Sequence, residues 1–366
     1  MKEGQYQFKA KKKGGVILVA PLNWGLGHAT RCIPIIRKLV KHGYDVVIAS
    51  DKGALNLLKQ EFPNLPAEAL PAYDITYTKD PKCFKWKLLL QIPNIAKVMR
   101  SERIATEALV KKYGITGIIS DNRFGVRHPN LPSVFVTHQI QVLSGWSTPI
   151  TSWLHQRIIK NFDQCWIPDY EGQDALSGVL SNDPDFKFPT AYVGPISRMK
   201  KETLKPTIDI LVLLSGPEPQ RSMLEEIMRE KFKNYPQKVV MVCGVIQETP
   251  QEKIIDGIQI FNFLTSHALE ALINQSKVVI SRSGYTTVMD LAKTKTPAFF
   301  IPTPGQYEQE YLAKRLSQNS IAPYCQQSAF DPILLRQLKD YDGWPVTAQK
   351  EKLSTLFGIF QGKREF

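Results

Sequence analysis

The stretch Val278-Val279-Ile280-Ser281-Arg282-Ser283-Gly284-Tyr285-Thr286-Thr287-Val288-Met289-Asp290-Leu291 decides the fold of this chain. Its apolar start predicts a buried strand, its small residues predict a turn, and a helix then begins near Thr286. The first turn of such a helix offers unpaired backbone N–H groups and the positive end of the helix dipole to an anion. Asp290 follows on the same helix, where a carboxylate can accept hydrogen bonds from ribose hydroxyls. An ordinary strand–turn–helix crossover of an α/β domain is the alternative interpretation.

A strand, a glycine turn and a helix in that order occur twice more along the chain. The first unit comprises strand Gly15–Ala20, turn Pro21–Gly27, helix Ala29–His42 and strand Asp45–Ser50, and the second comprises strand Ile208–Leu214, turn Ser215-Gly216 and helix Arg221–Phe232. The lysine-rich segment Pro195–Thr207 between them resembles a linker. We therefore predict an α/β protein with two Rossmann-like domains facing a cleft, with function at the carboxyl ends of the strands. We predict that the first domain comprises residues 1–195, that the second comprises residues 196–345, and that residues 346–366 contain a terminal helix.

The composition indicates an acidic partner. The 366 residues include 47 Lys and Arg against 34 Asp and Glu, a formal net charge of +13. A membrane surface, a phosphorylated lipid or nucleic acid would fit this charge, but no nucleic-acid-binding motif occurs. No apolar run could span a bilayer and Met1–Lys13 lacks the apolar core of a secretory signal. The five scattered cysteines resemble reduced thiols, so we expect a cytoplasmic protein.

Three ionisable side chains follow three strands of the first predicted domain. His28 ends the loop Asn23-Trp24-Gly25-Leu26-Gly27, Asp121 follows strand Thr116–Ser120, and His138 follows strand Ser133–Thr137. Since the carboxyl ends of parallel strands meet at one edge of a sheet, we expect these side chains to lie together. The alternatives are helix-capping roles for His28 and Asp121 and a buried, hydrogen-bonded His138.

Residues 208–318, and more faintly 15–145, resemble the family 28 UDP-N-acetylglucosamine transferases (the MurG group), which have the two-domain GT-B fold. The match rests on Arg282, Ser283-Gly284, Thr287 and Asp290, and on Tyr307-Glu308-Gln309 farther along. The chain departs from the family where Gln139 replaces a Glu after His138, where Asp121-Asn122-Arg123 replaces glycines of the acceptor loop, and where Leu312 replaces an Asn.

The resemblance implies a role for each of these positions. The implied donor-binding residues are Ser215, Gly216, Arg221, Phe263, Leu264, Thr265, Arg282, Ser283, Gly284, Tyr285, Thr286, Thr287, Asp290, Glu308 and Gln309. The implied acceptor-binding residues are Gly25, Gly27, Asn122, Arg123, His138 and Gln139. Arg221 is expected to pair with a diphosphate, and either His28 or Asp121 is expected to be the catalytic base.

The implied function is that of an inverting glycosyltransferase acting in cell envelope glycan synthesis. It would move a hexosyl or N-acetylhexosaminyl group from a UDP-sugar to a hydroxyl acceptor, for which a lipid-linked sugar is one candidate. We predict neither a cofactor nor a metal, because the acidic triplets Asp183–Asp185 and Asp340–Asp342 do not follow strands. A nucleotide-sugar hydrolase or 2-epimerase on the same fold, and a non-enzymatic nucleotide- or lipid-binding protein, are the alternatives.

The segment Pro81–Lys112 carries eight Lys and Arg residues against two Glu, interleaved with Trp, Phe and Leu. This pattern predicts reversible binding to anionic lipid at the inner face of the cytoplasmic membrane. A helix that buries its apolar face and exposes its basic face is the alternative.

Overall fold

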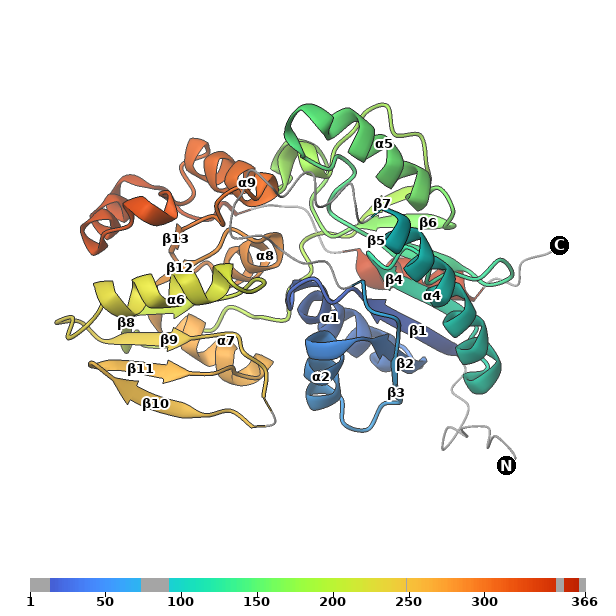
Figure 1. The fold of residues 1–366 in the computed structure, drawn as a ribbon, viewed down its shortest axis with the longest axis horizontal. Helices are drawn as coiled ribbons and strands as arrows, with labels where there is room; N and C mark the ends of the chain where they lie inside the picture. The colour runs from blue at the N-terminus through green and yellow to red at the C-terminus, as the bar shows by residue number, and fades with distance from the viewer. Residues whose placement is uncertain (1–13, 74–91, 248, 347–351, 362–366) are drawn as a thin grey trace.

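The computed structural model describes residues 14–73, 92–247, 249–346 and 352–361. It contains two α/β halves that lie side by side, each built on a mainly parallel sheet with helices packed against it (Figure 1). The predicted pair of Rossmann-like domains is confirmed.

The first sheet has the strand order β3-β2-β1-β4-β5-β6-β7, and all its neighbouring strands are parallel. Its strands are β1 Val16–Pro21, β2 Asp45–Ser50, β3 Ala67–Ala69, β4 Gly117–Asp121, β5 Ser133–Val136, β6 Gln164–Ile167 and β7 Thr190–Tyr192. The strand order reverses between β1 and β4, and open α/β sheets generally bind ligands at the carboxyl ends of the strands beside such a reversal. His28 follows β1 and Asp121 ends β4, so both predicted catalytic residues lie at that point.

The second sheet has the order β10-β11-β9-β8-β12-β13, with only β10 antiparallel to its neighbour among the described strands. Its strands are β8 Ile208–Leu213, β9 Val239–Val242, β10 Glu252–Ile255, β11 Ile258–Phe261, β12 Ser276–Ser281 and β13 Ala298–Phe300. Here the order reverses between β8 and β12. The turn Ser215-Gly216 follows β8 and the segment Arg282–Thr287 follows β12, so both predicted donor-binding turns share one edge.

Helices cover both sheets and continue the alternation with the strands. They are α1 Gly27–Lys41, α2 Lys52–Glu61, α4 Ile92–Tyr113, α5 Thr148–Ile159, α6 Gln220–Lys231, α7 Ser266–Asn274, α8 Tyr285–Thr294 and α9 Tyr307–Gln318, with short 3₁₀ turns η2 Gly145–Ser147, η3 Gly172–Asp174, η4 Gly178–Leu180, η5 Gln327–Ala329, η6 Pro332–Asp340 and η7 Leu353–Phe360. Helix α1 buries Ile33, Ile36 and Leu39 against the first sheet, as its apolar periodicity predicts.

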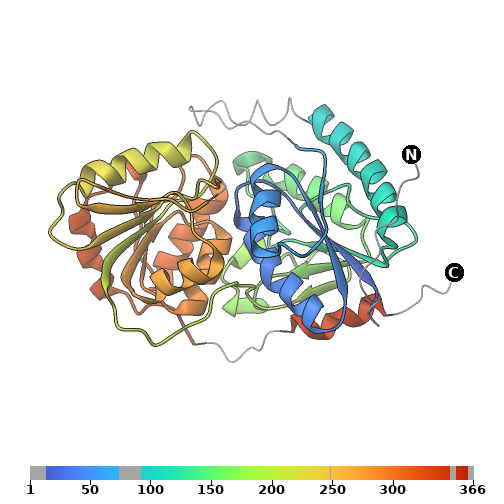
Figure 2. The same cartoon turned by 90° about the horizontal axis from the view of Figure 1, so that it is seen from below.

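The last described helix, η7, packs on the first half and not on the second, which precedes it in the chain. Its Leu353, Phe357 and Phe360 belong to the core around β1 and β2, and the hydroxyl of Tyr44 donates a 3.0 Å hydrogen bond to the carbonyl of Phe357. Figure 2 shows η7 and α4 on opposite sides of this half.

Helix α4 covers the described part of the basic segment predicted to bind lipid; residues 81–91 lie outside the described residues. Val98, Leu109 and Tyr113 are buried, whereas Lys97, Arg100 and Arg103 are exposed. Over residues 94–112 the helix buries Val98 and Leu109 and turns its basic side chains outward, as the alternative interpretation of this segment expected, but Ile104 is an exception with 68% of its surface exposed.

Candidate active site

His28 lies in the first turn of α1, where the carboxyl ends of β1 and β4 meet. The loop that precedes it contains Gly25 at φ +75°, a left-handed conformation that favours glycine. The amide oxygen of Asn23 accepts a 3.1 Å bond from the backbone N–H of Ala54 in α2, which ties the loop to the next helix. This loop brings Nδ1 of His28 to 2.7 Å from Oδ1 of Asp121.

Arg31, one turn further along α1, was not among the predicted site residues. Its guanidinium donates two hydrogen bonds to the carboxylate of Asp121, through Nε and Nη2, and lies 3.2 Å from Nδ1 of His138 through Nη1. Arg31 and Asp121 are almost completely buried. An arginine three residues after the histidine, on the same helix face, is the only signal for it in the sequence.

The surroundings of Asp121 favour a buried, paired carboxylate over a catalytic base. Burial by itself would raise the pKa of Asp121, but the charges of Arg31 and His28 outweigh it and lower the pKa from 3.8 to about 2. The side chain is also inaccessible to an acceptor, because none of its surface is exposed. Of the two predicted bases, this environment favours His28, and Asp121 is the carboxylate that contacts it.

His28 is neutral near pH 7. Burial, followed by the charge of Arg31, lowers the pKa of His28 below 6.5, although Asp121 opposes this shift. Nδ1 of His28 lies 2.7 Å from the carboxylate of Asp121, which can only accept a hydrogen bond, and 2.8 Å from Nη2 of Arg31, which can only donate one. In the tautomer that pairs with Asp121, the imidazole proton is on Nδ1 and Nε2 carries the lone pair. The described residues provide no hydrogen-bond partner for Nε2, so in this tautomer Nε2 is free to accept a proton.

His138 joins the two halves of the molecule. Its Nδ1 accepts from Arg31, and its Nε2 donates a 2.8 Å hydrogen bond to Glu308 at the start of α9. The carboxylate of Glu308 also accepts from the amide of Gln139. The ring of Tyr285 from α8 stacks on His138 with 4.3 Å between centroids. The carboxylate partner of His138 thus comes from Glu308 of the second domain, and not from the residue that follows His138 in the sequence, which is Gln139.

Of the other predicted acceptor residues, Asn122 lies near the base and Arg123 does not. The amide of Asn122, held at φ +56°, is 3.5 Å from Nδ1 of His28. The guanidinium of Arg123 is fully buried and bonds Glu102, Asp51 and the carbonyls of Pro21 and Pro71. Arg123 therefore ties the ends of β1, β2 and β4 together, which corrects its predicted role in acceptor binding.

The turn that carries His28 contacts the N-terminus of α8 directly. The hydroxyl of Thr286 donates a 3.1 Å hydrogen bond to the carbonyl of Gly27. A Cβ atom at Gly27 would lie 2.9 Å from that hydroxyl, so glycine is required for this approach. Gly284 is the N-cap of α8, and the backbone N–H groups of Tyr285, Thr286 and Thr287 have no acceptor among the described residues.

Two arginines that were predicted to bind the donor form contacts within the second domain. Arg221 forms ion pairs with Glu218 and Glu225, both at 2.6 Å. Arg282 is buried and donates to the carbonyls of Ile301, Pro302 and Gln220 and to the side chain of Gln327. The printed contacts of both guanidinium groups are with the protein itself, so their donor-binding roles stay predictions, and the N–H groups at the start of α8 are the other groups able to hold an anion.

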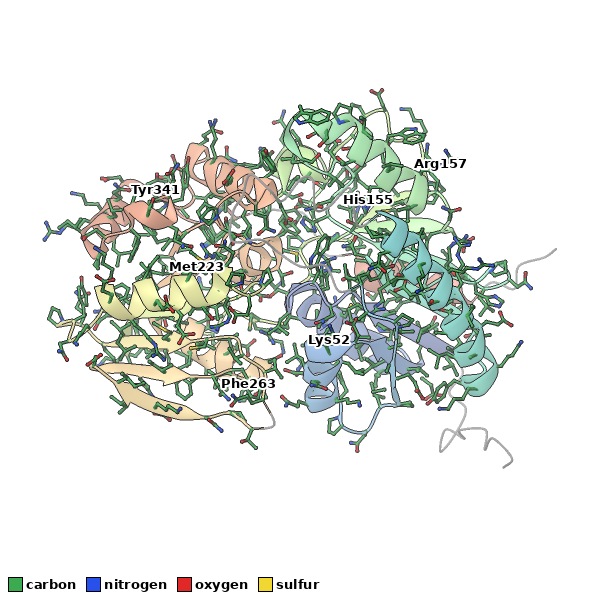
Figure 3. The ribbon with its side chains drawn as sticks, in the orientation of Figure 1. Lys52, His155, Arg157, Met223, Phe263 and Tyr341 are labelled. Atoms are coloured by element: carbon green, nitrogen blue, oxygen red, sulfur yellow. The ribbon has the colours of Figure 1, made fainter. Side chains whose placement is uncertain are left out.

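The remaining predicted donor residues surround this edge of the second sheet. Gln309 accepts from the N–H of Thr303 at 2.8 Å, and the hydroxyl of Ser283 donates to the carbonyl of Gln309. Phe263, labelled in Figure 3, is buried with 1% of its surface exposed, while Leu264, Thr265, Ser215 and Gly216 are partly exposed. Asp290 accepts a 2.6 Å hydrogen bond from Ser197 of the linker, and burial raises the pKa of Asp290 to about 6.

Comparison with known proteins agrees with this geometry. Residues 215–347 match the model of the glycosyltransferase family 28 C-terminal domain. An uncharacterized glycosyltransferase of Methanopyrus kandleri is 22% identical over 302 residues, which is 78% of this chain and 85% of the relative. The UDP-N-acetylglucosamine–N-acetylmuramyl-(pentapeptide) pyrophosphoryl-undecaprenol N-acetylglucosamine transferase of Histophilus somni is 22% identical over 349 residues, 90% of each chain. The chain is a glycosyltransferase related to family 28.

Solved structures show that its fold is GT-B. The MurG of Acinetobacter baumannii superposes with a TM-score of 0.51 at 16% identity, covering 94% of this chain and 93% of that one. The spinosyn rhamnosyltransferase SpnG superposes with a TM-score of 0.61 at 13% identity, covering 95% and 96%. Within the matched family domain lie α8, Glu308 and Gln309, which face His28 and His138 across the interface between the two halves.

Two further observations concern the parts of the chain that the structure describes. No group of three or more His, Cys, Asp or Glu side chains there is placed to hold a metal ion. None of the helices in those ranges has the length and apolar content needed to cross a bilayer.

Proposed function

We propose that this glycosyltransferase moves a hexosyl or N-acetylhexosaminyl group from a UDP-sugar to a hydroxyl acceptor, with inversion and without a metal. The observation that carries the proposal is the contact between Gly27 and Thr286. It brings the neutral imidazole of His28 next to the N-terminus of α8. A general base and an anion-binding helix end on facing domains are the two parts that this reaction needs.

On the donor side, α8 would receive the diphosphate. The N–H groups of Tyr285, Thr286 and Thr287 and the helix dipole would stabilise the negative charge that develops on the departing UDP. UDP is proposed because the relatives of Histophilus somni and Campylobacter fetus are named as UDP-N-acetylglucosamine transferases. Two structural neighbours, VinC and SpnG, are described in complex with thymidine diphosphate, so the nucleotide has to be tested.

On the acceptor side, Nε2 of His28 would take the proton of the acceptor hydroxyl. The oxygen then attacks the anomeric carbon from the face opposite the leaving diphosphate, and this displacement inverts the configuration. Asp121 stabilises the imidazolium as it forms, with its own charge held by Arg31. Contact between the domains keeps water from the reacting carbon, which limits hydrolysis.

The acceptor is proposed to be lipid-linked, and the enzyme to bind reversibly at the inner face of the cytoplasmic membrane. The support is the net charge of +13 and the undecaprenol in the names of several relatives. A basic protein is attracted to the anionic surface where such an acceptor resides.

Thermal melting with nucleotides and nucleotide sugars tests the donor. Because a ligand that binds only the folded state stabilises it by mass action, UDP and UDP-sugars should raise Tm more than the GDP and dTDP series. Equal shifts with all three nucleotides, or none with UDP, would refute the donor assignment.

The products and a chelator test the reaction. Inversion predicts a product of opposite anomeric configuration by NMR, and excess EDTA should leave turnover unchanged. Retention, or an absolute need for Mn²⁺ or Mg²⁺, would contradict the mechanism. Release of free sugar as fast without an acceptor as with one would instead identify a hydrolase.

A further inference from the structure

Glu308 brings a second carboxylate to the candidate base from the other half of the molecule. It lies in the first turn of α9, and its carboxylate accepts a 2.8 Å hydrogen bond from Nε2 of His138 and another from the amide of Gln139. The side chain of Glu308 is 20% exposed, so the protein encloses most of it. A general base needs one carboxylate partner, which Asp121 already provides, so the position of Glu308 requires another explanation.

A continuous series of hydrogen-bond contacts joins Glu308 to His28. Nη1 of Arg31 lies 3.2 Å from Nδ1 of His138, and Nη2 of the same guanidinium lies 2.8 Å from Nδ1 of His28. Because an arginine only donates and a carboxylate only accepts, His138 accepts through Nδ1, donates through Nε2 and is neutral in this arrangement. The series therefore runs from α9 across the interface between the two halves to the candidate base.

The charges of this cluster do not cancel. Burial by itself would raise the pKa of Glu308, but His138, and after it His28 and Arg31, outweigh burial and lower the pKa below 4.5. Glu308 and Asp121 are thus two anions, Arg31 is one cation, and the two imidazoles are neutral. These five side chains carry one net negative charge, and they become neutral when His28 takes a proton.

The balance would be different without Glu308. The charges of Asp121 and Arg31 would then cancel, so a proton on His28 would leave one uncompensated positive charge in a buried site. Burial, and after it the charge of Arg31, already lowers the pKa of His28. A second carboxylate compensates the new charge of the imidazolium, so Glu308 makes His28 a stronger base.

Other groups around His28, on the elements packed against it, are uncharged near neutral pH. They are Cys32 of α1, Asn122 after β4, and Thr286 and Tyr285 of α8. Burial raises the pKa of the Cys32 thiol well above 9.0 and that of the Tyr285 phenol well above 10.0, so both stay protonated. In the part of the chain that the structure describes, Glu308 is thus the charge through which the second domain contacts this cluster.

We propose that Glu308 strengthens His28 as a base from across the interface, so that the strength of the base depends on contact between the two domains. If the domains separate, the carboxylate of Glu308 leaves the cluster and Arg31 opposes protonation of His28. The same contact brings the N-terminus of α8 to Gly27, so one movement assembles the anion site and strengthens the base. Glu308 acts through its neighbours and is a positioning residue. This inference rests on the proposed function of His28 as the general base.

The resemblance to family 28 implies a different role for Glu308, which is contact with the donor sugar. Glu308→Gln distinguishes the two roles, because glutamine keeps the shape and the hydrogen-bonding groups of the side chain but removes the charge. Gln139 can turn its amide so that its oxygen accepts from the new amide, and the hydrogen bond from His138 is retained.

Histidine NMR measures the effect of this charge without turnover. The Cε1–H signal of His28, identified by its absence from His28→Gln, is followed against pH in wild type and Glu308→Gln. Loss of one negative charge roughly 10 Å away should lower the pKa of His28 by about 0.5–1 unit at an effective dielectric constant of about 20–40. The control Glu310→Gln removes an exposed carboxylate of the same helix, which accepts from the N–H of Gly305, and should leave the titration of His28 unchanged.

A double variant tests the dependence on domain contact. Gly27→Ala disturbs the approach of Thr286 to Gly27 and should lower the pKa of His28 when Glu308 is present. In Gly27→Ala/Glu308→Gln the pKa should be close to that of Glu308→Gln alone, because the carboxylate that contact delivers is already absent. An equal further fall in the double variant would exclude the dependence on domain contact.

Kinetics test the same coupling in the reaction. In Glu308→Gln, kcat at neutral pH should fall about three- to tenfold and the loss of kcat/KM in acid should move to lower pH, with KM for the donor within about twofold of wild type. The proposal is overturned if His28 titrates alike in wild type and Glu308→Gln, or if Glu308→Gln raises KM for the donor and leaves kcat and the pH profile unchanged. The expected NMR shift in a protein that transfers no sugar would refute the proposed function and not the charge coupling.

Discussion

Asparagine in place of Asp121 tests the buried ion pair on which the candidate base depends. The carboxylate of Asp121 is inaccessible, accepts two hydrogen bonds from the buried Arg31 and contacts His28 at 2.7 Å. Asparagine has nearly the same shape but no charge, and its amide N–H₂ would point at a donor. The substitution therefore leaves the guanidinium of Arg31 buried without a counterion.

The expected loss of folding free energy follows from the pKa shift of Asp121 and from the cost of leaving a buried charge unpaired. The pKa of Asp121 falls from 3.8 to about 2 in the folded protein, and a shift of that size corresponds to roughly 2–3 kcal/mol of folding free energy at pH 7. Removal of one partner from a buried ion pair costs about 3–5 kcal/mol, because the other charge is left uncompensated. We expect Asp121→Asn to lower the unfolding free energy of the first domain by about 3–5 kcal/mol.

Amide hydrogen exchange measures this loss domain by domain. Protection in β1 and β4 should fall, while β8 and β12 of the second domain serve as internal references. Glu107→Gln, which removes a carboxylate 46% exposed and in contact with Lys111 and His128, is the matched control and should change protection far less. Asp121→Leu combined with Arg31→Met should cost less than Asp121→Asn alone, since no charge is then left buried.

The pH dependence has a defined sign. Because the folded pKa of Asp121 is the lower one, its contribution to stability is complete above about pH 4 and is lost as the pH falls toward 2. Asp121→Asn should therefore differ from wild type most at neutral pH and converge with it in acid. A loss below about 1 kcal/mol at pH 7, or one shared equally by β8 and β12, would refute the reasoning.

Three further predictions concern turnover. His28→Ala should lower turnover by about 10²–10⁴-fold. The UDP-induced shift of Tm should stay unchanged, because the proposed donor site is on the other domain. Loss of that shift would contradict the assignment of His28 as the catalytic base. Since the pKa of His28 lies below 6.5, kcat/KM should fall only as the pH falls below that value, where His28 becomes protonated. A pH profile in which kcat/KM depends on a group with a pKa above 7 would indicate another base. Gly27→Ala places a Cβ 2.9 Å from Thr286 Oγ1 and should lower turnover because it disturbs the contact between the domains. The double variant Gly27→Ala/Thr286→Ala removes the clash and should recover part of the turnover rate. A double variant no faster than Gly27→Ala would exclude the steric explanation.

Much of the fold could be predicted from local sequence. The parallel strands are buried on both faces, so they occur as continuous apolar runs that glycine turns punctuate. The predicted strand Asp45–Ser50 coincides with β2, and the strand predicted at Gly15–Ala20 is β1, one residue further along. The short β3 and β7 and the exposed β10 were missed, because three or four residues of mixed polarity carry little periodic signal.

The candidate site was predictable only in part. His28, Asp121 and His138 were placed at one edge because each follows a parallel strand, and that rule needs no knowledge of side-chain contacts. The rule about strand ends does not predict which groups an arginine side chain contacts. Arg123, Arg221 and Arg282 each follow or face such an edge, yet their guanidinium groups are occupied by carboxylates or carbonyls of the protein.

The sequence alone determined which segments form helices and strands, and which strand ends lie at the same edge of a sheet. Both follow from local apolar runs and from the parallel connections between strands. What only the tertiary structure decided are contacts between residues far apart in the chain. Arg31 reaches Asp121 across 90 positions and His138 reaches Glu308 across 170, and no local pattern specifies such pairs. Likewise, α4 and α5 both carry apolar residues at helical spacing, but packing buries Val98 and Leu109 of α4 and leaves Trp153 and Leu154 of α5 exposed. Periodicity defines a helix face but does not specify what covers it.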